Sequence, residues 1–152
     1  MIERQGDMFE EYLSPEVVYV ITTNGYVKNN GQAVMGRGTA LIAATIAPKL
    51  PTILGDLLIS YGNKPYLLPG NFVTLPVKHK WDEKADPVLI GKSLDILMDM
   101  WDLYGFGKRQ VYIPRPGCGN GQLAWETVKP MMEYYFGGEP HAALNNVTVW
   151  SL

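Results

Sequence analysis

Three loops contain the residues whose types and spacing could support chemistry, and each loop follows a predicted strand. The first loop ends in Met35-Gly36-Arg37-Gly38-Thr39, directly before a predicted helix. Glycines let the backbone approach a ligand closely, and the first N–H groups of a helix attract an anion such as phosphate. The same pattern also suits a flexible connection with a helix cap, so both interpretations stay open.

The second loop runs from Pro114 to Leu123 and has glycines at positions 117, 119 and 121. Its backbone N–H groups are candidates for a second anion cradle, although a plain surface turn would use the same residues. Two such loops suit a ligand with two phosphates better than one loop does. Neither glycine loop has the Gly-Lys-Ser/Thr ending of a P-loop, and neither has a GxGxxG Rossmann turn.

The third loop, Lys78-His79-Lys80-Trp81, places two lysines and a histidine beside a tryptophan. One lysine could project into a pocket as a cation, or as a nucleophile if its amine is neutral and desolvated. The alternative is an exposed turn in which these side chains are solvated.

Composition limits the class of protein. The 152 residues are 47% hydrophobic and 18% charged with a net charge of −2, which indicates one globular domain over residues 1–152 and argues against a broad basic surface. No apolar run of about 18 residues is present, and the start of the chain does not resemble a signal peptide. The single cysteine, Cys118, fits a reducing compartment, so a cytoplasmic location is expected. No metal-ligand spacing is visible, and neither a metal nor a cofactor is expected.

Strands and helices alternate along the chain, which predicts an α/β sheet with helices on its faces and a ligand at the carboxyl ends of the strands. Pro76 is expected to end the second strand, and Pro130 to delay or kink the last helix. Core positions are expected for Met98, Trp101 and Tyr104, and helix packing for residues 134–136. The predicted strands are 17–22, 72–77, 110–113 and 146–151, and the predicted helices are 37–47, 86–104 and one within 125–136.

From Gly6 to Leu152, the order of these segments resembles the macro domain family. The resemblance is strongest to the branch that holds terminal ADP-ribose protein glycohydrolase and the DarG antitoxin, and its most specific stretch is Pro114-Arg115-Pro116-Gly117-Cys118-Gly119. It implies a three-layer α/β/α fold with a mixed central sheet and a pocket for ADP-ribose.

The resemblance also implies roles for single residues. Asp7 would accept the adenine amino group beside the Met8 backbone, Asn24 would bind the distal ribose, and Lys78 would be catalytic. The other implied ligand residues are Met35, Gly36, Arg37, Gly38 and Thr39 in the first loop, and Pro116, Gly117, Cys118, Gly119, Asn120, Gly121, Gln122 and Leu123 in the second.

The chain departs from that branch at two places. Gly121 stands where the glycohydrolase has an aspartate that helps to release a lysine adduct, which leaves a lysine-only route open. The first loop is also longer, because Lys28-Asn29-Asn30-Gly31-Gln32 precedes Met35. This insertion is either a determinant of substrate choice or an inert surface loop.

Three functions fit the resemblance. The first is an ADP-ribosyl hydrolase that removes ADP-ribose from a modified nucleobase or protein through Lys78. The alternatives are a non-catalytic reader of ADP-ribose and an ADP-ribose 1″-phosphate phosphatase. A short contact with modified single-stranded DNA is compatible with the cluster of Arg37, Lys78, His79, Lys80 and Trp81, because cations hold phosphates and an aromatic ring stacks on a base.

Overall fold

Two adjacent inner strands of the sheet are buried along nearly their whole length. β2 (Val17–Asn24) and β4 (Phe72–Lys78) run parallel to each other. Near-continuous apolar and β-branched runs of this kind are typical of parallel strands covered on both faces. The computed structural model describes residues 1–10, 12, 14–137 and 146–152.

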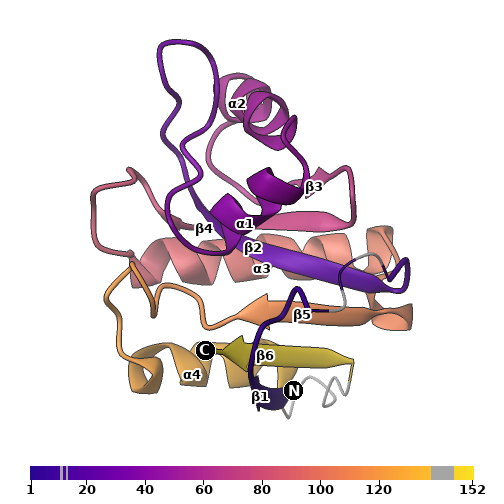
Figure 1. The fold of residues 1–152 in the computed structure, drawn as a ribbon. Coiled ribbons are helices and arrows are strands. Elements are labelled where there is room, and N and C mark those ends of the chain that lie inside the picture. The colour runs from indigo at the N-terminus through magenta and orange to yellow at the C-terminus, as the bar shows by residue number, and fades with distance from the viewer. Residues whose placement is uncertain (11, 13, 138–145) are drawn as a thin grey trace.

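The sheet has six strands in the described part of the chain, in the order β1-β6-β5-β2-β4-β3 (Figure 1). Neighbouring strands are parallel except at one edge, where β3 pairs antiparallel with β4. The sheet is therefore mixed, which confirms the expectation from the sequence. The other four strands are β1 (Ile2–Gln5), β3 (Leu67–Leu68), β5 (Gln110–Pro114) and β6 (Val147–Ser151).

Helices cover both faces of this sheet, so the predicted three-layer α/β/α arrangement is confirmed (Figure 1). Two helices pack on one face and two on the other. The first pair is α1 (Thr39–Ile46) and α2 (Leu50–Tyr61), and the second is α3 (Pro87–Leu103) and α4 (Trp125–Phe136), with a short 3-10 turn, η1 (Phe106–Lys108), after α3.

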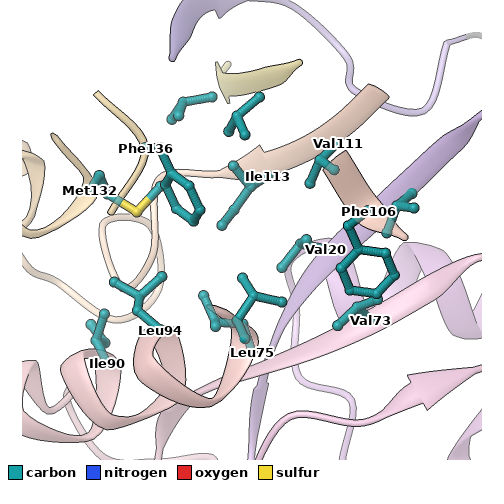
Figure 2. Packing of buried hydrophobic residues seen from close by; sticks show 14 of the residues in the cluster. Val20, Val73, Leu75, Ile90, Leu94, Phe106, Val111, Ile113, Met132 and Phe136 are labelled. Carbon is teal, nitrogen blue, oxygen red and sulfur yellow. The ribbon is translucent and has the colours of Figure 1, made fainter. Parts of the chain in front are cut away.

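Successive side chains of β2 point to opposite faces and supply two separate cores. Tyr19 and Ile21 belong to the core under α1 and α2, whereas Val18 and Val20 belong to the core under α3 and α4. Figure 2 shows the second core, in which side chains from β2, β4, β5, α3, η1 and α4 interlock: Val20, Val73, Leu75, Ile90, Leu94, Phe106, Val111, Ile113, Met132 and Phe136.

Asp86 caps the start of α3. The Asp86 carboxylate accepts a hydrogen bond from the Val88 N–H at 2.9 Å, and Pro87 occupies the first helical position. Trp101 is buried near the end of this helix, as expected, but Tyr104 is 45% exposed, so its predicted core position is wrong. Tyr104 comes after the last helical residue, where the buried stripe of α3 no longer continues.

β4 continues through Pro76 to Lys78, which corrects the prediction that the proline ends the strand. The Thr74 N–H donates to the Tyr66 carbonyl on the β3 side. Two residues later, Pro76 faces the same side, but β3 pairs only with Phe72 and Val73. The missing N–H of proline therefore costs no ladder hydrogen bond at this position.

Other differences concern boundaries and missed elements. α1 begins at Thr39 rather than at Arg37, and α4 begins at Trp125, so a delayed start caused by Pro130 is wrong. Tyr134 is exposed, with its ring against that of the neighbouring Tyr135. The sequence patterns did not predict α2, β1 or β3. No helix of the described chain is long and apolar enough to cross a membrane.

Candidate functional site

The carboxyl ends of the parallel strands meet at one edge of the sheet, to the left in Figure 1, where the arrows of β5 and β6 point. Asn24 ends β2, Lys78 ends β4 and Pro114 ends β5. The three loops singled out in the sequence therefore leave the sheet side by side. This is the position at which parallel α/β sheets bind ligands.

Asn24 braces the base of the first loop. Its side-chain N–H donates to the Val34 carbonyl at 2.8 Å, and its Oδ1 accepts from the Tyr26 N–H at 2.9 Å. The side chain is buried between the two arms of the loop. The predicted ribose contact would have to use the second amide hydrogen and the second lone pair of this side chain.

The insertion at positions 28–32 forms the tip of an anchored hairpin. Val27 and Ala33 form a β-bridge, and the Ala33 N–H donates to the Pro51 carbonyl of α2 at 2.8 Å. A Cβ atom on Gly55 of α2 would lie 1.9 Å from the Gly31 carbonyl oxygen. The hairpin therefore lies directly on α2, in a contact that only glycine at position 55 permits.

The end of the first loop presents open backbone to solvent. Gly36 has φ +70°, and a Cβ atom on Gly36 or Gly38 would meet no atom within 4 Å. The N–H groups of Arg37, Gly38 and Thr39 donate to no acceptor in the described part of the chain. These unpaired donors at the N-terminus of α1 could hold an anion.

Thr39 attaches the start of α1 to the sheet. Its Oγ1 accepts from the Thr22 N–H at 3.1 Å and lies 3.3 Å from the Thr22 hydroxyl. Arg37 is exposed and Met35 is half-buried against the core under α1 and α2. The five predicted ligand residues of this loop thus lie together around the first turn of α1.

Lys78 connects the third loop to the second. Its Nζ donates to the carbonyl oxygens of Trp81 and Asn120, each at 3.3 Å. Its own carbonyl accepts from the Asn63 side chain at 3.0 Å, which fixes the end of β4. Sequence reasoning did not identify Asn63, whose contact depends on how the turn after α2 folds back.

The second loop is closed by its own backbone. Gly117 has φ +73°, the Leu123 N–H donates to the Gly117 carbonyl, and the Gln122 N–H donates to the Gly119 carbonyl. The N–H groups of Gly119, Asn120 and Gly121 have no acceptor among the described residues. A second set of unpaired donors therefore lies next to the Lys78 amine, as the anion-cradle interpretation requires.

Position 121 has no room for a side chain. A Cβ atom there would lie 2.5 Å from the Gly117 carbonyl oxygen and 2.7 Å from the Ala85 Cβ. Gly121 also accepts a hydrogen bond from the Ala85 N–H at 3.0 Å. An aspartate cannot replace this glycine without moving the loop.

The remaining residues of the second loop have structural contacts. Pro116 is buried, and Leu123 packs against the core under α3 and α4. The Cys118 thiol lies 3.5 Å from the Pro116 carbonyl, and burial raises its pKa. Because the thiolate is the nucleophilic form of cysteine, this environment disfavours a reactive Cys118.

Asp7 and Met8 lie at a separate small cavity of about 70 Å³, which Arg4, Glu10, Tyr112 and Trp150 complete. One Asp7 oxygen accepts from the Phe9 N–H at 2.9 Å, whereas Oδ2 has no hydrogen-bond partner in the described chain. Trp150 both lines this cavity and packs on Tyr112, with ring centroids 5.3 Å apart. Asp7 therefore acts as a turn residue and still has a free acceptor.

Arg4, Glu10 and Tyr112 were not identified from the sequence. Arg4 reaches the cavity because β1 pairs with β6 in a register that sets it beside Trp150. That register cannot be deduced from single residues. The β1 residues are all exposed, so no hydrophobic alternation revealed the strand.

A larger cavity, about 580 Å³, lies at the opposite end of the parallel strands, near the amino ends of β2 and β5. Pro15, Glu16, Arg109 and Gln110 are among its lining residues, and none of the predicted ligand residues is. No group of three or more His, Cys, Asp or Glu side chains in the described ranges is placed to hold a metal ion.

Comparison with known proteins identifies the architecture. No protein-family model matches the sequence, and no curated protein is significantly similar to it. Among solved structures, the macrodomain of Mycobacterium tuberculosis DarG superposes with a TM-score of 0.78 at 21% identity, over 99% of this chain and 97% of that one. This chain has the macrodomain fold.

Two further macrodomain structures agree. The Thermus aquaticus DarG macrodomain gives a TM-score of 0.74 at 20% identity, over 99% of this chain and 97% of that one. Thermosipho africanus DarTG, solved in complex with ADP-ribose, gives 0.71 at 21% identity, over 98% of this chain and 41% of that longer one. The three structures therefore share their architecture with nearly the whole of this chain.

Proposed function

We propose that this macrodomain binds ADP-ribose along the carboxyl edge of its sheet. The observation that carries this proposal is that two sets of unpaired backbone N–H groups, at Arg37–Thr39 and Gly119–Gly121, flank the end of the same sheet. Two adjacent anion cradles suit a diphosphate. Thermosipho africanus DarTG, which has this fold, was solved with ADP-ribose bound.

The small cavity provides for the adenine end of the ligand. The free Oδ2 of Asp7 would accept the exocyclic amino group, and Trp150 and Tyr112 offer apolar ring surface beside it. A charged acceptor favours adenine over a base with a carbonyl at that position. Asn24 would then contact the distal ribose from the base of the first loop.

We further propose that Lys78 makes the protein an ADP-ribosyl hydrolase. A neutral Lys78 amine would attack the anomeric carbon of the distal ribose, and the bond to the modified group would break with its electron pair going to that group. Water would then release ADP-ribose from the lysine adduct. The crowding at Gly121 supports a route in which no acid at that position takes part.

The acceptor that carries ADP-ribose is proposed to be a nucleobase or a protein side chain. Trp81 is 52% exposed and follows Lys78 by three residues, and Lys80 is exposed beside it. An exposed indole next to cations supports a short contact with single-stranded DNA. The single cysteine supports a reducing, cytoplasmic location for this activity.

A non-catalytic reader is the second candidate function. In the structure the Lys78 amine donates to two backbone carbonyls, an arrangement that suits a charged ammonium as well as a nucleophile. A reader would bind ADP-ribose without releasing it from any conjugate.

The test compares Lys78→Ala with Lys92→Ala, a control at an exposed lysine of α3. The hydrolase proposal expects Lys78→Ala to bind ADP-ribose but to release none from ADP-ribosylated oligonucleotide or protein, while Lys92→Ala behaves as wild type. Binding without release by wild type would favour the reader. Phosphate release from ADP-ribose 1″-phosphate that persists in Lys78→Ala would identify a phosphatase instead.

A further inference from the structure

The segment that joins β4 to α3, residues 79–86, contains most of the third loop and contacts the other two loops of the candidate site. The His79 carbonyl accepts from the Gly25 N–H of the first loop at 3.1 Å. The Ala85 N–H donates to the Gly121 carbonyl of the second loop at 3.0 Å. Within the segment, the Trp81 carbonyl holds the Lys78 amine. The shape of this segment therefore decides where that amine lies.

One ion pair closes the segment from end to end. The His79 Nε2 lies 2.9 Å from Asp86 Oδ2, while Asp86 Oδ1 accepts from the Val88 N–H and the Asp86 N–H donates to the Val77 carbonyl. The hydrogen bond from His79 is the main cause that lowers the pKa of Asp86. Asp86 is thus a fixed point at the start of α3, to which His79 attaches the beginning of the segment.

The ion pair is too exposed to contribute much to global stability. The side chains of His79 and Asp86 are 56% and 37% exposed, and exposed pairs of this kind have little effect on the free energy of unfolding. The pair nevertheless joins the two ends of a short stretch of six residues. Its loss should therefore change the conformation of this segment rather than the stability of the fold.

We propose that His79 and Asp86 are positioning residues that hold the Trp81 carbonyl, and through it the Lys78 amine, in place. This inference rests on the proposed role of Lys78. Without the ion pair, the segment would move away from the end of β4 and one of the two acceptors of the amine would be lost. A neutral imidazole with its proton on Nε2 still donates to the carboxylate, so the contact does not require a charged His79.

The first variants are His79→Ala, which removes the donor, and His79→Gln, whose side-chain amide can donate to Asp86 from a similar place. Asp86→Asn keeps an oxygen acceptor for the Val88 N–H, so the cap of α3 remains while the charge is lost. In each protein the acylation rate of the Lys78 amine by a soluble anhydride is measured by mass spectrometry, with the exposed Lys92 as internal control. This readout needs no substrate.

The proposal expects Lys78 to be acylated severalfold faster in His79→Ala than in wild type, with His79→Gln close to wild type and Lys92 unchanged throughout. Single-turnover release of ADP-ribose should fall by about tenfold in His79→Ala, because a slightly misplaced reacting group loses much of its rate. Affinity for ADP-ribose and the melting temperature should stay near the wild-type values.

Two results would overturn the proposal. One is an unchanged Lys78 acylation rate in His79→Ala. The other is a parallel loss of melting temperature and ADP-ribose affinity, which would make the ion pair a general structural contact. If wild type itself releases no ADP-ribose, the hydrolase proposal fails, and the acylation rates still decide whether the pair positions the amine.

Discussion

The two glycine loops of the site have similar composition but use glycine for opposite reasons. In the first loop, Cβ atoms on Gly36 and Gly38 would enter open space. In the second, Cβ atoms on Gly117 and Gly121 would collide with Ala85, Ile90 and the loop's own backbone. Glycine at positions 36 and 38 leaves room for a ligand, whereas glycine at positions 117 and 121 satisfies the packing of the protein itself.

The loops also differ in how they are held. Side chains help to fix the first loop, since Asn24 joins its two arms and Thr39 attaches its end to β2. Backbone hydrogen bonds and the contact with Ala85 fix the second. Substitutions at Gly36 and Gly38 should therefore change ligand affinity without changing stability, whereas substitutions at Gly117 and Gly121 should change both together.

The largest effect is expected for Gly121→Asp. The new Cβ would lie 2.5 Å from the Gly117 carbonyl oxygen, so the loop must move. We expect a loss of about 1–3 kcal/mol in the free energy of unfolding, the usual cost of overpacking. Thermal unfolding measures this change.

Gly119→Asp is the matched control, because a Cβ atom at position 119 meets nothing within 4 Å. It adds the same charge to the same loop and should leave the melting temperature near wild type, although the charge would weaken binding of a phosphate. Equal melting temperatures for Gly121→Asp and wild type would show that the second loop is not packed as described.

A smaller effect, confined to the ligand, is expected for Gly38→Ala. The added methyl group meets no protein atom, so stability should change by less than about 0.5 kcal/mol. If a diphosphate lies against this backbone, the same methyl group should weaken ADP-ribose affinity by about tenfold, which corresponds to a modest steric cost. Calorimetric titration measures the affinity.

Gly62→Ala provides the converse control. Gly62 has φ +94° and lies outside the site, so alanine there should lower stability without changing the affinity for ADP-ribose. An affinity that Gly38→Ala leaves untouched would mean that the ligand does not approach the first loop.

Thr39→Val should weaken the attachment of α1 to β2. Valine keeps the shape but leaves the Thr22 N–H without its acceptor, which costs about 1 kcal/mol and lowers the melting temperature by a few degrees. Thr45→Val, in the last part of the same helix, removes only a bond within the helix and should have a smaller effect. Equal effects of the two variants would contradict the anchoring role of Thr39.

The smallest effect is expected at Glu3, which contacts residues at both ends of the second loop. Glu3 accepts from the Trp125 N–H at 3.0 Å and pairs with Lys129 at 3.0 Å and with Arg115 at 3.7 Å. The hydrogen bond from Lys129 is the main cause that lowers the pKa of Glu3 below its ordinary 4.5. Because the pKa of Glu3 is lower in the folded protein, the ionised carboxylate stabilises the fold at pH values above 4.5. This stabilisation is lost as the pH falls through the lowered pKa.

Glu3→Gln should therefore be less stable than wild type at neutral pH, by no more than about 0.5 kcal/mol because the group is solvent-screened. The difference should shrink as the pH falls from the ordinary 4.5 through the lowered pKa of Glu3, where the carboxylate of the folded wild type becomes protonated. Urea unfolding at neutral and acidic pH measures it. A difference that grows on acidification would contradict the assignment.

The elements with strong hydrophobic patterns were predictable from the sequence. The buried run of β2 and the capped, amphipathic α3 gave clear signals, and both lie close to where they were expected. α2 was missed because the predicted helix 37–47 ends before Pro48 and no second helix was expected after it, although Pro51 lies in the first turn of α2 and Leu50, Leu54 and Leu58 repeat every four residues. β1 was missed because it is polar and exposed.

For the site, sequence order was enough to place the three loops at the same edge of the sheet. Contacts between the loops were not predictable, because they join residues that are far apart in the sequence. The Lys78 amine binds the carbonyl of Asn120, 42 positions away, and Gly121 packs against Ala85. The aspartate missing at position 121 was visible in the sequence, but the absence of space for it depends on the conformation of the loop.

The most direct test of a shared diphosphate site is calorimetric titration of ADP-ribose into the wild-type protein at one fixed salt concentration, with AMP and NAD as controls. We expect binding in the micromolar range, with ADP-ribose preferred over AMP because both loops and the Asp7 cavity are engaged. Absence of binding, or equal affinity for AMP, would contradict the claim that the two loops form one site for the diphosphate.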